Sequence, residues 1–251
     1  MPRDIPIRSS NCSARMPETS PTEVLLTVRH LLLFDIDGTL LDASGAGRLA
    51  LGRALASEFG VPDPHLEVGF AGRTDRAIAS EALIEHGLDA DEECYRRYLD
   101  AYVEELPESL AQSDGRVLPG VPGLLRSLHQ REDVVLGILT GNMERAARLK
   151  LAHFELDGFF VGGGYGDEHH DRDDVAREAL RALSPLCAAD AKTWVIGDTR
   201  NDVRCARAID ARAVAVCGGF GRRAELIEAA PDHLLDDLSD CDGFLSLLDD
   251  A

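Results

Sequence analysis

Lysine is nearly absent from this chain of 251 residues. Only Lys150 and Lys192 occur, whereas aspartate and glutamate together number 45. Arginine therefore supplies almost all of the positive charge, and the formal net charge is −19. Nucleic acids and anionic lipids bind to basic surfaces, so this balance predicts a protein that has neither nucleic acid nor membrane as a partner.

Long apolar runs are missing too, since none approaches the ~20 residues that a membrane-spanning helix needs. The first 22 residues contain three arginines with prolines and serines but no apolar run, so we expect no secretory signal. Residues 1–28 are expected to form a disordered tail. The six cysteines are scattered without a C-x-x-C pair, which argues against a zinc site or a redox dithiol. We expect a cytoplasmic protein with reduced thiols.

Short apolar runs recur along the chain and alternate with helical patterns. We expect strands at residues 31–37, 134–140, 159–163, 193–198 and 213–219. Amphipathic helices are expected at about 122–130, 143–153, 173–184, 201–209 and 222–230. The runs are continuous rather than alternating, which favours strands buried on both faces. The pattern predicts an α/β fold with a doubly wound parallel sheet.

The interval between the first two strands breaks this rhythm. Residues 44–118 contain no strand pattern but three helical patterns, at about 45–59, 74–86 and 91–106. We interpret the interval as an all-helical cap inserted into a core formed by residues 29–43 and 119–251. Thr74 or Asp75 is expected to be the N-cap of the second cap helix.

Polar residues that carry chemistry follow three of the strands directly. They are Asp35 and Asp37 after the first strand, Thr140, Gly141 and Asn142 after the second, and Asp198 and Asp202 after the fourth. Ligands of open α/β sheets bind beyond the carboxyl ends of the strands, so these residues are expected to converge. Carboxylates gathered there need a cation, and Mg²⁺ takes oxygen ligands together with substrate phosphate. Thr140 and Asn142 offer hydroxyl and amide donors to phosphate oxygens.

Three segments resemble motifs of the haloacid dehalogenase (HAD) superfamily: "DIDGTL" at 35–40, "TGN" at 140–142 and "GDTRND" at 197–202. The resemblance covers about residues 30–235. A fourth segment, "GFAGRTDRAI" at 69–78, is similar to the start of a cap helix in phosphoglycolate-phosphatase-like members with a C1-type helical cap. The resemblance implies a HAD-like Rossmannoid core and a Mg²⁺-dependent phosphatase. Such an enzyme hydrolyses a small phosphorylated metabolite through an aspartyl-phosphate intermediate.

The resemblance also implies roles for individual residues. Asp35 would be the nucleophile, and Asp37 would protonate the leaving oxygen and then activate water. Asp35, the backbone carbonyl of Asp37 and Asp198 would hold Mg²⁺, with Asp202 behind them. The phosphoryl group would be bound by Thr140, Gly141 and Asn142.

The third motif of the family usually supplies a lysine, and here the sequence departs from the pattern. The matching stretch at 166–180 offers Arg172, whose guanidinium can bind two phosphate oxygens. The alternative is that Arg172 merely pairs with Asp171 or Asp173. Lys150 lies about two turns into a helix and Lys192 precedes a strand, so neither lysine is expected in the site.

Arg73 lies in the cap between a glycine and a helix start, where its side chain could face the site. A cation there suits a second anionic group two or three atoms from the phosphate. The leading substrate is therefore phosphoglycolate. Arg48 is expected to have a structural role.

Other activities remain open on the same motifs. A phosphomutase of the β-phosphoglucomutase type is one alternative, although the cap lacks the Thr-x-x-His segment of such enzymes. A catalytically idle binding module is another, although the intact acids argue against it. A dehalogenase or phosphonatase would not need Asp37, and a phosphonatase would need a cap lysine, which residues 44–118 lack.

Overall fold

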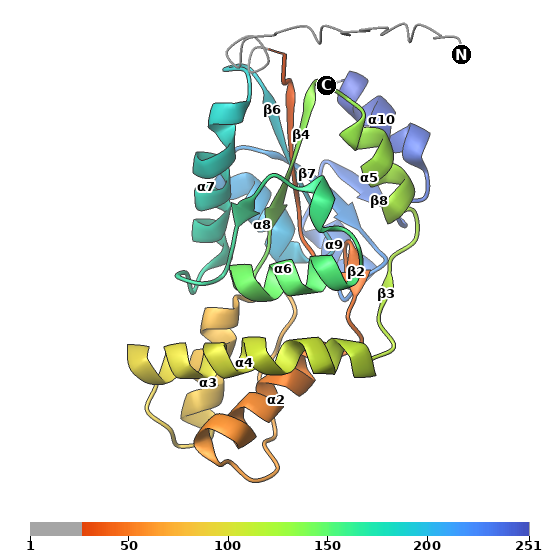
Figure 1. Cartoon of the computed structure of the whole chain (residues 1–251). Helices are drawn as coiled ribbons and strands as arrows, with labels where there is room; N and C mark the ends of the chain where they lie inside the picture. The colour runs from red at the N-terminus through yellow and green to blue at the C-terminus, as the bar shows by residue number, and fades with distance from the viewer. Residues whose placement is uncertain (1–26, 251) are drawn as a thin grey trace, which may run out of the picture.

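The computed structural model describes residues 27–250 (Figure 1). Residues 1–26 of the predicted tail lie outside the described residues. Val28 is buried, and its carbonyl accepts a hydrogen bond from the Ala188 N–H at 2.9 Å, so packing begins just before the predicted boundary. Among the helices of residues 27–250, none combines the length and the apolar character that crossing a membrane requires.

A parallel sheet of six strands forms the centre of the molecule, in the order β5-β4-β1-β6-β7-β8. Its strands are β1 His30–Phe34, β4 Val134–Leu139, β5 Gly163–Gly164, β6 Lys192–Gly197, β7 Arg212–Val216 and β8 His233–Leu235. β1 pairs with both β4 and β6, so Phe34 lies beside Ile138 and Ile196. The residues that follow these three strands are therefore neighbours at one edge of the sheet.

Helices cover both faces of this sheet (Figure 1). The core helices are α5 Val121–His129, α6 Glu144–His153, α7 Arg172–Leu183, α8 Arg200–Ala208, α9 Arg223–Glu228 and α10 Cys241–Asp249. Leu32 and Phe34 of β1 belong to the apolar cluster that contains residues of α5, α6 and α10. Leu31 and Leu33 belong to the cluster on the other face, with α7, α8 and α9. The continuous apolar run of β1 thus fills two cores, which confirms the doubly wound α/β prediction.

The cap helices form a separate layer beyond the carboxyl end of the sheet (Figure 1). They are α2 Ala46–Phe59, α3 Asp75–Glu85 and α4 Glu92–Gln112. The chain enters this layer through β2 Leu41–Asp42 and leaves it through β3 Arg116–Val117. These two short strands pair antiparallel, so the two crossings lie side by side.

Several elements differ from the sequence predictions. β8 and α10 were not expected, β5 is far shorter than 159–163, and β3 falls in the interval where no strand pattern was seen. The third cap helix does not stop at residue 106 but continues through Pro107 to Gln112. Ser109 and Leu110 are buried beyond the proline, so packing outweighs the lost backbone hydrogen bond.

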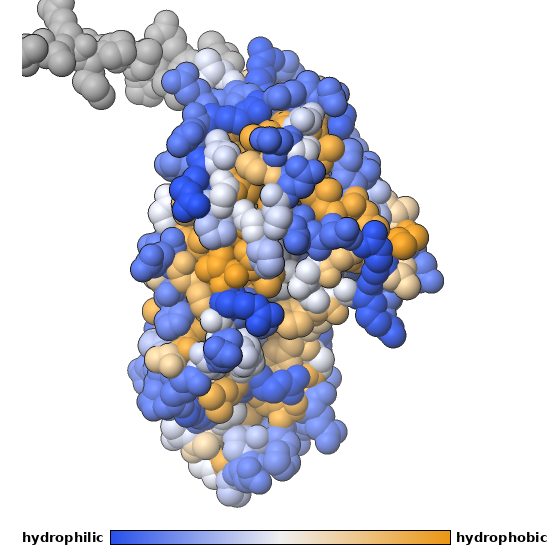
Figure 2. Space-filling model, turned by 90° about the vertical axis from the view of Figure 1, so that its right-hand side faces the viewer, coloured by the Kyte–Doolittle hydropathy of each residue, from blue (hydrophilic) through white to orange (hydrophobic). Residues whose placement is uncertain are grey.

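The surface is mainly hydrophilic. On the face shown in Figure 2, hydrophobic residues reach the surface in groups separated by hydrophilic ones. Large exposed apolar side chains include Ile84, Val161, Phe220 and Ile227, which lie on different elements or loops. Single exposed apolar residues of this kind are ordinary in folded proteins.

Two glycines with nearly equal backbone angles allow a matched test of packing. Gly45 and Gly120 are the N-caps of α2 and α5, with φ of 82° and 80°. A Cβ on Gly45 meets nothing within 4 Å, whereas one on Gly120 would overlap the backbone carbonyl of Leu238. We predict that Gly45→Ala costs about 1–2 kcal/mol of unfolding free energy through the left-handed backbone alone. Gly120→Ala should lose about 1–3 kcal/mol more.

Urea unfolding of the two variants and the wild type measures this difference. Equal losses for both variants would contradict the close approach of Leu238 to Gly120.

Candidate active site

A cavity of about 360 Å³ lies where the strand ends face the cap. Its lining includes most of the residues predicted from the sequence: Asp35, Asp37, Thr140, Gly141, Asn142, Arg172 and Arg73. Asp198 and Asp202 lie behind this lining but next to Asp35, as described below. The structure therefore brings the predicted site residues together from three strand ends and the cap.

Asp35 is the first residue after β1 and is 5% exposed. Its backbone N–H donates to the Ile196 carbonyl at 2.9 Å, which continues the ladder to β6 and fixes its position. The pKa of the Asp35 carboxyl is raised to about 7, mainly by burial; Arg172 opposes the shift, and the neighbouring Asp202 adds to it. The position of this buried carboxyl is therefore set by the backbone hydrogen bond of Asp35 to β6.

Asp198 follows β6 and lies against the turn that begins at Asp37. Gly38 in that turn has a φ of 85°, and a Cβ there would overlap the Asp198 carboxylate. Asp198 Oδ2 accepts hydrogen bonds from the backbone N–H groups of Phe220 at 2.5 Å and Gly221 at 3.3 Å. Burial raises the pKa of Asp198 to about 8, with further contributions from the Asp202 and Asp35 carboxylates.

Asp35, Asp198 and Asp202 form a buried acidic cluster, in which one ligand oxygen of each lies within 4.8 Å of the others. Asp202 is already fully engaged. Its Oδ2 accepts from the N–H and hydroxyl of Thr199 at 2.9 and 2.7 Å, and its Oδ1 accepts from Arg172. Asp35 Oδ1 lies 3.5 Å from Arg172, and Asp198 Oδ1 accepts a long hydrogen bond from the Thr39 hydroxyl at 3.5 Å. These contacts are longer than those of Asp202, so Asp35 and Asp198 can more readily give an oxygen to a divalent cation, and Asp202 supports them from behind.

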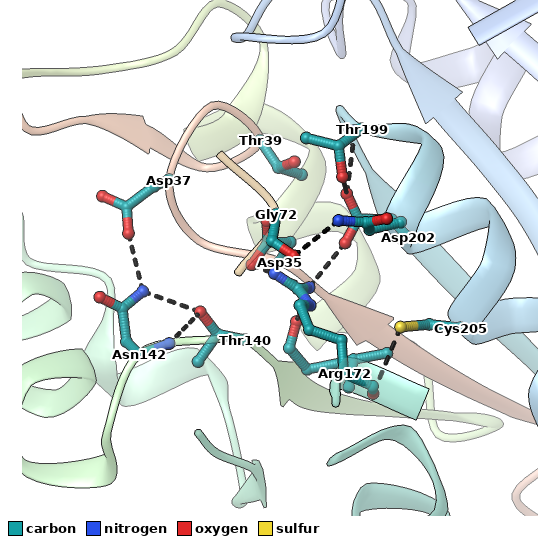
Figure 3. A network of polar contacts seen from close by, with 12 residues as sticks. Asp35, Asp37, Thr39, Gly72, Thr140, Asn142, Arg172, Thr199, Asp202 and Cys205 are labelled. Carbon is teal, nitrogen blue, oxygen red and sulfur yellow. Dashed lines mark hydrogen bonds and ion pairs between the residues drawn. The ribbon is translucent and has the colours of Figure 1, made fainter. Parts of the chain in front are cut away.

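Arg172 is the first residue of α7 and points into the cluster (Figure 3). Its Nη2 donates to Asp202 Oδ1 at 2.6 Å and lies 3.5 Å from Asp35 Oδ1. The Nε of the same side chain is buried and has no hydrogen-bond acceptor among residues 27–250. The guanidinium thus keeps a donor that an oxygen of a bound substrate could use.

The alternative that Arg172 pairs with its sequence neighbours is wrong. Asp171 and Asp173 are bound by Arg204, at 2.5 and 2.8 Å. Asp171 also caps α7, since its side chain accepts from the Asp173 N–H. These acids leave Arg172 free to turn inward.

Asp37, Asn142 and Thr140 form a second polar network at the cavity (Figure 3). Asn142 Nδ2 donates to Asp37 Oδ2 at 2.7 Å and to Thr140 Oγ1 at 2.8 Å. Since the threonine oxygen accepts here, its own hydroxyl hydrogen is available to another acceptor. Gly141 lies between them, where a Cβ would overlap the Arg73 carbonyl of the cap.

Lys150 belongs to this network, contrary to the expectation from its position in the sequence. Its Nζ donates to Asp37 Oδ2 and to Asn142 Oδ1, both at 2.7 Å, and the residue is 5% exposed. A signal was present in the sequence. Met143, Ala146, Ala147, Lys150 and Leu151 are the buried positions around α6 and follow helical spacing, so the lysine interrupts an apolar stripe.

The start of α3 ties the cap to the core beside this network. Thr74 is the N-cap, and its Oγ1 accepts from the Ala77 N–H at 3.2 Å. Asp75 N–H donates to the Gly141 carbonyl at 2.6 Å, and Asp75 Oδ2 accepts from the Met143 N–H at 2.9 Å. Burial raises the pKa of Asp75 to about 6, although Lys150 opposes the shift. The sequence interpretation of Asp75 as a simple cap residue missed this contact.

The two cap arginines at the cavity are both engaged by the cap itself. Arg73 Nη1 lies 2.5 Å from Glu81 Oε2 and 3.3 Å from the Gly69 carbonyl. Arg48 donates to backbone carbonyls of the loop that follows α2, and its guanidinium lies over the Phe70 ring, 4.1 Å from the centroid.

Comparison with known proteins places this site in a family. The sequence profile of haloacid dehalogenase-like hydrolases matches residues 32–207, and a second profile for HAD-like hydrolases matches residues 174–241. The chain is 32% identical to a phosphoglycolate phosphatase of Synechococcus elongatus over 214 residues, which cover 83% of this chain and 93% of that one. It is 30% identical to phosphoglycolate phosphatase 1 of Pseudomonas aeruginosa over 218 residues, covering 84% and 78%.

The fold agrees with solved structures of the same type. One is CbbY from Rhodobacter sphaeroides in complex with phosphate, with a TM-score of 0.67 and 21% identity over 85% of this chain and 96% of that one. With the sequence profile spanning residues 32–207 and the predicted motif residues gathered at one cavity, the chain belongs to the haloacid dehalogenase-like hydrolase family.

Proposed function

We propose that the protein is a phosphatase that hydrolyses a small phosphorylated acid, with phosphoglycolate as the leading substrate. The observation that carries the proposal is the meeting of Asp35, Asp37, Thr140 and Arg172 at one cavity. The relatives at 30% and 32% identity are named phosphoglycolate phosphatases, which favours hydrolysis over the phosphomutase alternative.

In the first step, an Asp35 carboxylate oxygen forms a bond to phosphorus while the bond from phosphorus to the leaving oxygen breaks. Arg172 lies beside Asp35 and can bind the oxygens of the transferring group, whose charge is spread over them. The free hydroxyl hydrogen of Thr140 is a second donor. This step yields an aspartyl-phosphate on Asp35 and an alkoxide that needs a proton.

Asp37 supplies that proton and then takes one from the water that cleaves the aspartyl-phosphate. The side chain is half-buried and held by Asn142 and Lys150, so its position is set from two sides. Hydrolysis returns Asp35 to its carboxylate and releases inorganic phosphate. Asp37 and Asp35 thus divide the chemistry between an acid–base group and a nucleophile.

The donor set fits a hard divalent cation, and we propose Mg²⁺. Asp35 and Asp198 are carboxyls whose pKa values are raised mainly by burial and further by neighbouring carboxylates. Asp35, Asp198 and the backbone carbonyl of Asp37 would hold the ion. When bound, it neutralises carboxylate and phosphate charge so that both can occupy the site.

The first prediction tests the nucleophile and the acid. With Mg²⁺ present, wild-type protein should release phosphate from phosphoglycolate, and EDTA should stop it. Asp35→Asn should lower kcat by several orders of magnitude because the covalent route is lost. Asp37→Asn should lower it by about 10²–10⁴-fold.

Asp89→Asn, an exposed position, is the control. Wild-type rates in either site variant, with an intact circular dichroism spectrum, would refute the assignment.

The second prediction concerns pH and metal. The folded pKa values of Asp35, Asp198 and Asp75 lie near 7, 8 and 6, above the model-peptide value of ~4 for an unfolded chain. The folded state therefore binds more protons, and without metal its unfolding free energy should fall as pH rises from 5 to 8.

Asp198→Asn should reduce that slope by up to about 1.4 kcal/mol per pH unit. The same variant should also weaken the dependence of activity on Mg²⁺. Chemical unfolding in EDTA at a series of pH values measures the slope, with Asp89→Asn as the matched control. A slope unchanged by Asp198→Asn would show that this carboxyl is ionised in the metal-free fold.

The third prediction concerns the arginine at the position of the usual lysine. Arg172→Ala should cost about 3–4 kcal/mol of transition-state stabilisation, and Arg172→Lys should recover part of it. Arg204→Ala removes an arginine that pairs with two neighbouring acids on α7 and should change kcat/KM little. Near-normal turnover in folded Arg172→Ala would reduce Arg172 to a structural partner of Asp202.

A further inference from the structure

The cavity contains one buried cation for which phosphoryl transfer has no direct need. Arg172 lies at the nucleophile, whereas Lys150 lies at the acid, Asp37, on the side that faces the cap. The cap contributes neighbours to this ammonium. A Cβ on Gly47 of α2 would lie 3.7 Å from Lys150 Nζ and 3.6 Å from the Tyr102 hydroxyl of α4. Lys150 thus lies at the boundary between the core part of the site and the cap.

An ammonium has three donors, and two of those on Lys150 bind Asp37 and Asn142. Asp37 must also reach the leaving oxygen of the substrate, since it delivers a proton there. The leaving oxygen therefore comes close to an aspartate that also contacts two side chains at 2.7 Å, Asn142 and Lys150. In phosphoglycolate the carboxylate carbon is only two bonds from that oxygen, so the carboxylate falls within reach of the same ammonium.

The start of α2 adds to this preference for an anion. This helix of 14 residues begins at Gly45 with no side-chain cap and has no acidic residue in its first turn. Gly45, Gly47 and Lys150 all line the cavity. Backbone N–H groups at a helix start and a lysine ammonium attract negative charge from two directions.

The cap arginines are less suited to the same task. Arg73 is bound by Glu81, and Arg48 by backbone carbonyls of its own loop. Asp75 is the acid that could oppose an anion near Lys150, but its carboxylate accepts from the Met143 N–H at the start of α6. Its charge is therefore directed toward a backbone donor of the core.

We propose that Lys150 recognises the carboxylate of the phosphorylated acid and sets the preference of the enzyme for acidic over neutral phosphate esters. This inference rests on the proposed function. It assigns the second anionic group to a core lysine rather than to Arg73, the cap residue expected from the sequence.

The test compares two esters that differ only in the group under question. Phosphoglycolate carries a carboxylate where 2-hydroxyethyl phosphate carries an alcohol, so the ratio of their kcat/KM values isolates recognition of that group. A role of Lys150 in positioning Asp37 would lower both values equally and leave the ratio unchanged. Recognition of the carboxylate would lower the ratio.

The variants are Lys150→Met and Lys150→Gln, measured in the full chain with Mg²⁺. The glutamine keeps a hydrogen-bonding group beside Asp37 if the methionine variant fails to fold. We expect the wild-type preference for phosphoglycolate to fall about 10- to 100-fold in both, the range for losing a charged hydrogen bond. Lys192→Met removes the other lysine, at the start of β6, and should leave the ratio unchanged.

The outcomes separate the two proposals. A wild type without preference for phosphoglycolate contradicts the proposed substrate class itself. A wild-type preference that survives in the folded Lys150 variants, or that collapses in Arg73→Met instead, leaves the phosphatase function intact but overturns the role of Lys150. Collapse in the Lys150 variants alone supports it.

Discussion

The site depends on placing several carboxylates at one edge of a buried sheet and compensating each of them differently. Three acids of the cluster lie within a few ångströms of one another, and their mutual repulsion opposes folding. Arg172 compensates Asp202 directly and Asp35 at a longer distance, while backbone N–H groups compensate Asp198. Burial is the main reason that the pKa values of Asp35 and Asp198 are raised, and neighbouring carboxylates add to the shift. If the protein's own groups fully neutralised these acids, a bound cation would gain little from them.

The cap is joined to this edge by close backbone contacts rather than by side chains alone. Gly141 admits the Arg73 carbonyl, and the Asp75 N–H donates to the carbonyl of Gly141 itself. On the other side, Asn201 Nδ2 donates to the Gly72 carbonyl at 2.8 Å. The segment at 72–75 therefore contacts both the loop after β4 and the start of α8. Any movement of the cap would therefore act on Gly141, which lines the cavity, and on the start of α8.

The sequence predicted the centre of the molecule well because strong local signals coincide there. The apolar runs that become β1 and β6, and the acids Asp35 and Asp198 that follow them, can be read from the sequence pattern alone. Elements at the margin were missed, since β8 has three half-buried residues and no clear apolar run. Lys150 was misjudged for a different reason. Distance along a helix says little about depth, and only the stripe of buried residues around it reveals the inward direction of its side chain.

Because lysine is scarce in this chain, its presence at the buried position 150 needs a physical explanation. Among residues 27–250 arginine serves nearly every ion pair, and at Arg172 a single nitrogen, Nη2, contacts Asp202, Asp35 and the Leu139 carbonyl. At position 150, Asp37 and Asn142 oxygens both accept from Nζ at 2.7 Å, and a Cβ on Gly47 of α2 would lie 3.7 Å from the same nitrogen. A compact ammonium can donate to both oxygens from one nitrogen. A guanidinium would bring a planar group with five donors to the same two acceptors. That geometry suits the ammonium of a lysine at position 150.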